Sequence, residues 1–130
     1  MDTPRAFPLW LLRLALASPF LFSGLTKALD FTGATAEVRG LTGLKPAGAF
    51  AAAVVAVQLG GSALLLAGGW AVGIGAALLA GFTLVATLVA HDFWNRPAGT
   101  ALRDATTFFE HVALIAGLGL AAWVSARRPG

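Results

Sequence analysis

The residues of this sequence that could do chemistry are polar or amphipathic side chains inside or beside long apolar runs. An ionisable group in hydrocarbon is costly and usually faces the interior of a helix bundle, so each is a candidate for ligand binding. The candidates are Arg13, Lys27, Gln58, His91, Asp92, Trp94, Glu110 and His111. No nucleophile, metal cluster or acid–base pair occurs among them at a convincing spacing, and we predict neither a catalytic residue nor a metal site.

Two cations mark one face of the first apolar run. Arg13 and Lys27 are fourteen residues apart, which at about 100° per residue brings them to within about 40° of the same helix face. Phe20 and Gly24 lie on that face, and Pro19 should bend the helix by removing a backbone donor. Both cations could instead extend their charged ends to opposite headgroup layers. This interpretation is as strong as a functional role for Lys27 and weaker than one for Arg13.

Polar residues repeat at helical spacing on the second and third runs. Gln58 and Ser62 are one turn apart on one face, and antiparallel packing would place Ser62, and more distantly Gln58, within reach of Arg13. The third run carries Thr83, Thr87 and His91 at intervals of four residues. For these threonines the simpler role, a hydrogen bond to their own helix, is favoured.

Five of the candidates should lie at one depth if neighbouring runs are antiparallel. They are Lys27, His91, Asp92, Glu110 and His111. Glu110 also has a simpler role, because Thr107 and Glu110 form the T-F-F-E pattern of a capping box at the start of the last helix. Haem ligation between His91 and His111 is a less favoured alternative, since both histidines lie within a turn or two of the interface.

Membrane-spanning helices are the elements that must position these side chains. Hydrophobic residues make up 58% of the 130 residues and charged residues 12%, outside the usual range of soluble domains. Four apolar stretches, about 7–29, 47–67, 70–94 and 105–126, are long enough to cross a bilayer. Because no stretch alternates apolar and polar residues, strands are excluded. We predict an all-α integral membrane protein, a single-domain four-helix bundle with up-down-up-down topology.

The connections between the stretches are short. Gly68 and Gly69 form a minimal hairpin, and residues 95–104 make the last loop. The longest loop, residues 30–45, contains Thr35 to Leu41, which could form a short helix on the membrane surface. An even number of spans places both termini on the same side.

Tryptophan placement supports these boundaries, because amphipathic rings prefer the headgroup zone. Trp10, Trp70 and Trp123 fall at one expected interface and Trp94 at the other. The distribution of lysine and arginine mildly favours cytoplasmic loops but leaves the orientation open. A cleaved signal peptide is a disfavoured alternative for the first run, since Arg13 would interrupt its apolar core and the run continues to Leu25.

Composition excludes several functions. The chain has no cysteine, which removes disulfide exchange, thiolate catalysis, iron–sulfur ligation and cysteine zinc sites. Its net charge is +3, but the cations are scattered rather than gathered in a patch. We therefore expect contact with lipid headgroups and not with nucleic acid.

Four segments carry a resemblance to a known family. The run LLRLALASPFLFSGLTKALD (Leu11 to Asp30) resembles the first helix of the DoxX family, with its arginine and its G-x-x-K pattern. Similar to the family's later helices are VQLGGSALLLAGG (57–69), HDFW (91–94) and FFEHVALIAGL (108–118), in the same order. Gln58 departs from the family's frequent glutamate, and Glu110–His111 from its Lys-Asn. The lost carboxylate weakens any proton chemistry that the resemblance would carry over.

The resemblance implies a bacterial inner-membrane protein of a family associated with quinone-linked oxidoreductase subunits. We accordingly expect a redox-associated accessory subunit that binds an apolar ligand such as a quinone within the bundle. Lys27, His91 and Glu110 would lie near the polar head of that ligand. An enzyme that acts alone is not expected.

Another class of function remains as an alternative. The chain could be a non-catalytic scaffold or assembly subunit of a membrane complex. Its glycine-rich faces would then pack against a membrane protein partner or a second copy of the chain. A transporter of small solutes is a third and weaker alternative, because only Pro19 interrupts a helix in mid-membrane.

Overall fold

The computed structural model describes the backbone of residues 3–127 and the side chains of residues 8–127. Its elements are α1 (Thr3–Leu29), α2 (Phe31–Thr42), α3 (Ala47–Ala67), α4 (Ala71–Ala90), the short 3₁₀ helix η1 (Phe93–Asn95) and α5 (Ala98–Ala126). No strand occurs in this described part of the chain. The predicted all-α class is therefore confirmed.

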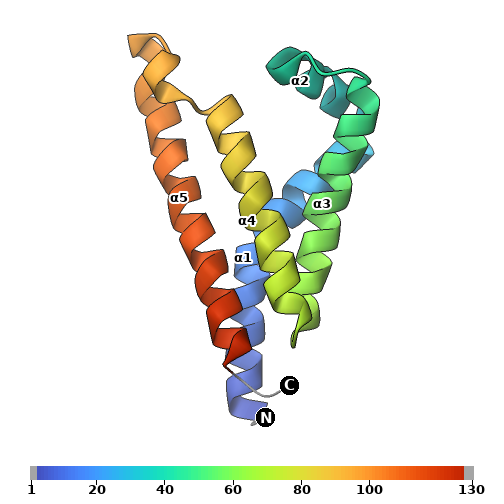
Figure 1. Cartoon of the computed structure of the whole chain (residues 1–130), viewed down its shortest axis with the longest axis vertical. Coiled ribbons are helices and arrows are strands. Elements are labelled where there is room, and N and C mark those ends of the chain that lie inside the picture. Colours follow the sequence, from blue (N-terminus) through green and yellow to red (C-terminus); the bar gives the residue numbers. More distant parts are fainter. Residues whose placement is uncertain (1–2, 128–130) are drawn as a thin grey trace.

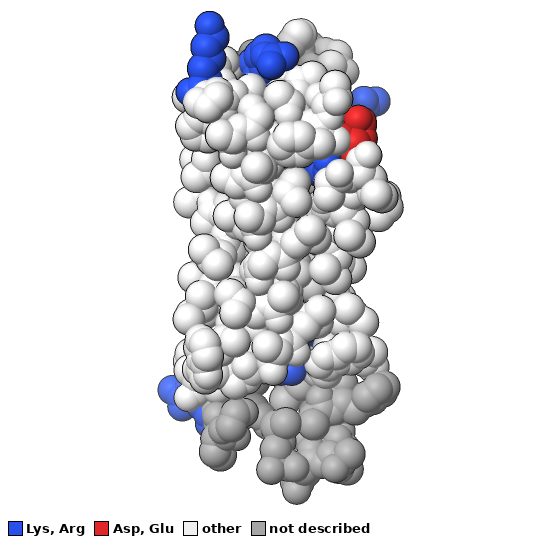
Figure 2. Space-filling view, turned by 90° about the vertical axis from the view of Figure 1, so that its right-hand side faces the viewer, with Lys and Arg blue, Asp and Glu red and all other residues white. Residues whose placement is uncertain are grey.

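Four of the helices are long and apolar enough to cross a membrane. The spans are Pro8–Leu29, Ala47–Ala67, Ala71–Asn95 and Ala98–Ala126. On the face shown in Figure 2, charged side chains gather toward the two ends of the molecule and the band between them is almost entirely uncharged. This distribution suits a hydrocarbon layer between two aqueous interfaces, and the predicted four-helix membrane bundle is confirmed.

The four spans run alternately up and down, and the first turns of α1 lie at the same end as the last turns of α5 (Figure 1). We call this the terminal end, and the end that carries α2 the loop end. α3 packs against α1 and α4, and α4 packs against α5, whereas α1 and α5 touch only sparsely. α1 contains Pro19 and changes direction along its length, as expected where proline removes a backbone donor. The bundle is consequently open along the line between α1 and α5.

Glycine allows α3 and α4 to approach each other closely. A Cβ atom on Gly75 would lie 2.6 Å from the carbonyl oxygen of Gly61 and 2.7 Å from the amide nitrogen of Leu65. Fully buried side chains pack around this contact and form the core of the bundle. They include Ala17, Leu65, Val72, Leu79 and Leu118. This core fills the middle and the terminal half of the bundle, and the helices spread apart beyond it, toward the loop end (Figure 1).

Two glycines in left-handed backbone conformations make the hairpin between α3 and α4. Gly68 has a φ of 83° and Gly69 a φ of 61°, values that side-chain-bearing residues rarely adopt. The hairpin predicted at these residues is confirmed.

The longest loop contains a helix, α2, at the loop end. The Asp30 carboxylate accepts a hydrogen bond from the Gly33 amide at 3.1 Å and caps its first turn, and Gly43 ends it with a φ of 67°. The short helix expected at Thr35 to Leu41 is therefore present and extends further at both ends. Its true limits are set by these caps, which the apolar periodicity does not register.

The last helix begins earlier than the sequence predicts. The apolar pattern indicates a loop over residues 95–104 and a helix from residue 105, but α5 begins at Ala98, directly after Pro97. The first turns of α5 are polar, and a criterion based on hydrocarbon-spanning length misses them. Thr107 therefore lies inside the helix, and the capping-box explanation of Glu110 is wrong.

Candidate functional site

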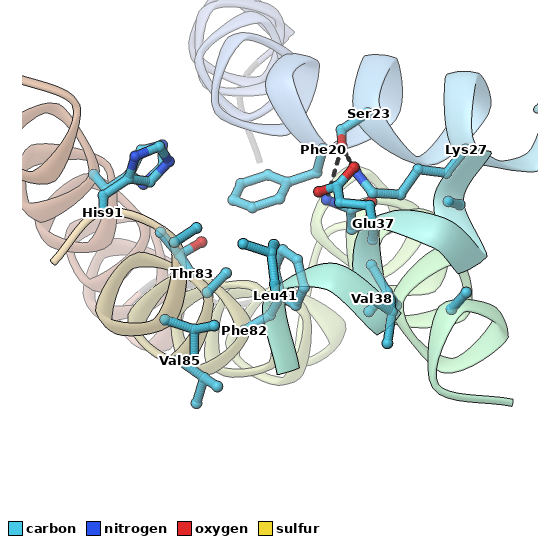
Figure 3. Close-up of a pocket in the computed structure, with 18 of the residues that line it drawn as sticks. Phe20, Ser23, Lys27, Glu37, Val38, Leu41, Phe82, Thr83, Val85 and His91 are labelled. Carbon is cyan, nitrogen blue, oxygen red and sulfur yellow. Dashed lines mark hydrogen bonds between the residues drawn. The ribbon is translucent and has the colours of Figure 1, made fainter. Parts of the chain in front are cut away.

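A cavity of about 420 Å³ lies at the loop end, and all five α-helices contribute to its wall. Its larger apolar side chains are Phe20, Val38, Leu41, Val54, Phe82, Val85, Val89 and Leu114. Apart from Thr42, its polar side chains form a lysine corner (Ser23, Lys27, Glu37 and Gln58) and a histidine corner (Thr83, His91 and His111). In Figure 3 the labelled members of the two corners lie on opposite sides of the cavity, with apolar side chains between them.

In the lysine corner, α1 and α3 share one hydroxyl group. Ser23 Oγ accepts hydrogen bonds from Lys27 Nζ at 2.6 Å and from Gln58 Nε2 at 3.1 Å, drawn as dashed lines in Figure 3. Gly24 permits this close approach, because a Cβ atom there would lie 2.7 Å from Leu59 Cδ2. The sequence predicted inward positions for both Lys27 and Gln58, and the structure brings them together through a serine that the sequence reasoning missed.

Gln58 leaves one strong acceptor without a partner. Its residue is only 3% exposed, and its Oε1 atom has no hydrogen-bond partner among the described residues. Nε2 of the same amide donates to Ser23 Oγ, and this orientation of the amide leaves Oε1 as the unpaired atom. A buried carbonyl oxygen without a donor costs about 1–3 kcal/mol. In this orientation the lysine corner therefore contains an unpaired acceptor close to the Lys27 ammonium group.

Glu37 is a member of this corner that the sequence did not reveal. It belongs to α2, and it lies on the same side of the cavity as Ser23 and Lys27 in the view of Figure 3. In the sequence it is one charge in a loop, indistinguishable from a solvated residue. Only the placement of α2 against α3 and α1 brings it to the cavity.

In the histidine corner, each imidazole is oriented by a neighbour. His91 Nδ1 lies 3.0 Å from Asp104 Oδ1, and His111 Nδ1 lies 2.8 Å from Thr87 Oγ1. Thr87 donates its single hydroxyl proton to the carbonyl oxygen of Thr83, so Thr87 Oγ1 accepts from His111 Nδ1–H. The carboxylate of Asp104 likewise accepts from His91 Nδ1–H. In its neutral form, each ring thus keeps Nε2 as an acceptor.

The two imidazole rings contact each other edge to face, with ring centroids 5.4 Å apart. Asp104, His91, His111 and Thr87 consequently form one connected polar group, of which the two histidines line the cavity. The same contact leaves no space for a porphyrin plane between the rings in this arrangement. Among the described residues, no group of three histidine, aspartate or glutamate side chains could hold a metal ion.

Three sequence candidates lie near the cavity but do not line it. Asp92 forms an ion pair with Arg96 at 2.8 Å, and Trp94 packs against Phe93 in an aromatic cluster with two phenylalanines of α5. Glu110 is exposed on the outer face of α5. Adjacent helical residues point about 100° apart, so the inward position of His111 turns Glu110 outward. The structure therefore does not place Glu110 with Lys27 and His91.

Arg13 lies at the opposite end of the bundle. Its Nη2 atom is 3.4 Å from the position of a Cβ atom on Gly68, and it lines a second hollow of about 570 Å³ between α1, α5 and the α3–α4 hairpin. We call this hollow the Arg13 groove. The expected approach of Arg13 to Ser62 is not found, because Arg13 lies at the hairpin and Ser62 donates to the carbonyl oxygen of Gln58 in its own helix.

Comparison with known families identifies this architecture. The family model described as DoxX matches residues 9–92, more than half of the chain. The chain belongs to the DoxX family. The match covers α1 to α4 and includes Lys27, Gln58 and His91, whereas His111 and Asp104 on α5 lie beyond it. No curated protein and no solved structure matches this DoxX-family chain.

Proposed function

We propose that this DoxX-family protein binds the head of a quinol or quinone in the loop-end cavity, as an accessory subunit of a membrane redox complex. The observation that carries the proposal is the buried Gln58 Oε1 atom, an acceptor without a donor, in the same corner as the Lys27 ammonium group. A quinol hydroxyl both donates and accepts hydrogen bonds. It can donate to Gln58 while it accepts from Lys27.

The shape of the cavity supports the same ligand. Its volume of about 420 Å³ lies in the range typical of small-molecule sites, about 300–1,000 Å³. A quinol is a flat apolar ring with oxygen atoms at opposite positions. The lysine corner and the histidine corner lie on opposite sides of an apolar cavity, so one oxygen would meet Lys27 and Gln58 and the other would meet His111.

The histidine corner supports a route for protons. Conversion of a quinone to a quinol consumes two electrons and two protons. His91 and His111 both line the cavity, and His91 Nδ1 contacts Asp104. The neutral imidazole of His91 can accept a proton at Nε2 and release one at Nδ1 toward Asp104. In this proposal the electrons come from a redox cofactor of a partner protein, and this chain holds the ring and conducts protons. The bacterial inner membrane is the compartment in which we expect it.

The test is the binding of a short-chain naphthoquinol to the purified protein in nanodiscs, measured by calorimetry under anaerobic conditions. Lys27→Met and Gln58→Leu should each weaken binding about tenfold, because each removes a buried hydrogen bond. Asp92→Asn and Glu110→Gln are matched controls outside the cavity and should bind as the parent does. Unchanged affinity in both cavity variants would refute the proposal.

A scaffold role is the second candidate, and four glycines favour it. Gly60, Gly73, Gly81 and Gly119 face open space, with no atom within 4 Å of an added Cβ. Such positions allow a partner helix or a second copy to approach closely. The scaffold role would be favoured by two results together. The parent chain would bind no quinol, and its Lys27→Met and Gln58→Leu variants would still co-purify with the same partner.

A further inference from the structure

The Arg13 groove contains one charged side chain in an otherwise apolar wall. Leucine, alanine, valine and glycine make up the lining apart from Arg13 and Ser125. Ser125 Oγ donates to the carbonyl oxygen of Gly69 at 2.8 Å, which joins the end of α5 to the hairpin and closes the groove at the terminal end. The guanidinium group lies against this closed end, beside Gly68.

No carboxylate of the described residues lies near Arg13. The acidic residues of residues 8–127 are Asp30, Glu37, Asp92, Asp104 and Glu110, and all belong to the loop end. Arg13 Nε is buried and has no hydrogen-bond partner in this part of the chain. A guanidinium group carries five N–H donors and does not lose its charge in proteins. No carboxylate of the described residues therefore balances its charge.

The depth of Arg13 matches that of lipid phosphate. Trp10, Trp70 and Trp123 are all exposed and lie at the terminal end, where tryptophan rings mark the headgroup zone. The guanidinium group lies beside the hairpin at this level. A lipid phosphate that contacts the Arg13 guanidinium group would therefore stay at the depth that phosphates occupy in the bilayer.

The groove opens sideways toward the bilayer. α1 and α5 touch only sparsely, and Leu12 and Leu120 on its two rims are 62% and 59% exposed. A hydrocarbon chain could lie between these helices along the apolar wall, starting at Arg13 and running toward the middle of the membrane. The groove thus combines a cationic end with an apolar trough, which is the pattern of a phospholipid.

We propose that one anionic phospholipid occupies the Arg13 groove, with its phosphate on the guanidinium group and one acyl chain between α1 and α5. Arginine binds phosphate oxygens through two parallel hydrogen bonds, which lysine cannot reproduce. The lipid would add to the sparse contact between α1 and α5 at this end. This inference is independent of the proposed quinol site, because it concerns different residues at the other end of the bundle.

Native mass spectrometry of the intact protein, released from nanodiscs of phosphatidylglycerol or phosphatidylcholine, tests the proposal. The parent protein should retain one phosphatidylglycerol molecule, with about tenfold preference over phosphatidylcholine. Arg13→Gln should remove this preference, and Arg13→Lys should restore it only in part. Arg127→Gln is the matched control at the same end, since Arg127 stacks on Trp123 outside the groove, and it should retain the lipid.

Two further arms make the result decisive if Arg13→Gln does not fold. Ala121→Phe fills the apolar wall but keeps Arg13, and it should also lose the lipid. Excess inorganic phosphate should not displace the lipid, because phosphate makes no contact along the trough. Retention of phosphatidylglycerol by Arg13→Gln or Ala121→Phe, equal binding of phosphatidylcholine, displacement by phosphate, or a second copy of the chain on Arg13 in place of lipid would each overturn the proposal.

Discussion

The lysine corner of the cavity and the Arg13 groove pose the same physical problem, a cation of α1 inside an apolar bundle, in different surroundings. Lys27 donates to Ser23 at 2.6 Å, with Gln58 and Glu37 in the same corner. Arg13 has no acidic residue of the described chain near it, and its Nε atom has no partner. In the lysine corner a neutral acceptor, Gln58 Oε1, is unpaired. In the Arg13 groove a full positive charge has no acidic partner among the described residues. A neutral, donating ligand therefore suits the cavity, and an anion suits the groove.

The packing of α3 against α4 supports the helices that form both sites, and its disruption gives the largest expected effect. Gly75→Ala would place a Cβ atom 2.6 Å from the Gly61 carbonyl oxygen and force α3 and α4 apart. Overpacking of a tight contact costs about 1–3 kcal/mol, and more where backbone has to move. We expect a clear fall in the thermal unfolding temperature in detergent and weaker binding at both sites. Gly73→Ala, on an open face of the same helix, is the control and should unfold like the parent.

The next largest effect separates the two sites. Arg13→Gln should reduce the amount of retained phosphatidylglycerol about tenfold and leave the naphthoquinol affinity unchanged. Lys27→Met should weaken naphthoquinol binding and leave the retained phosphatidylglycerol unchanged. Native mass spectrometry measures the retained lipid, and calorimetry measures the naphthoquinol affinity. If either substitution weakened both ligands to the same extent, the two regions would be one coupled site and the comparison would fail.

A smaller effect concerns the histidine corner. Thr87→Val keeps the shape of the side chain but removes the oxygen that accepts from His111 Nδ1 at 2.8 Å. The imidazole then loses its fixed tautomer, and naphthoquinol affinity should fall about threefold to tenfold, as for one neutral hydrogen bond. Thr106→Val removes only a bond to the same helix on the exposed face of α5. A loss of affinity that is equal in the two variants would rule out the assigned role of Thr87.

The smallest effect concerns the closed end of the groove. Ser125→Ala removes the hydrogen bond to the Gly69 carbonyl oxygen and should lower the free energy of unfolding by about 0.6 kcal/mol, the average for such bonds between membrane helices. Equilibrium unfolding in mixed micelles measures the difference. Ser18→Ala, whose hydroxyl bonds to its own helix, should cost less; an equal or larger cost there would contradict the role of the Ser125 bond.

Much of the fold follows from the sequence, because hydrocarbon requires long apolar helices with paired backbone groups. The spans and the Gly68–Gly69 hairpin are therefore readable in advance. Lys27, His91 and His111 are readable too, since a polar residue in a span faces the interior and antiparallel helices bring fixed positions to one depth. The inward position of Gln58 is also readable, but the sequence directs it toward Arg13 and the structure pairs it with Ser23.

The remaining features depend on tertiary placement. Glu37 reaches the cavity only because α2 packs against α3 and α1, and the pattern of its twelve residues does not specify these partners. The outward position of Glu110 depends on the rotation of α5 about its axis, and the location of Arg13 beside Gly68 depends on how far α1 is shifted along α3. Apolar patterns determine neither rotation nor shift.

The central claim is that Gln58 makes the cavity a site for a hydrogen-bond donor, and comparison of the two redox forms of one ligand tests it most directly. A quinone ring offers only acceptors and leaves Gln58 Oε1 unpaired, whereas the quinol satisfies it. The affinities of the same short-chain naphthoquinol and naphthoquinone, measured by calorimetry, should differ about tenfold in favour of the quinol, and Gln58→Leu should abolish the difference. Equal or tighter binding of the quinone, or a preference that survives Gln58→Leu, would contradict the account.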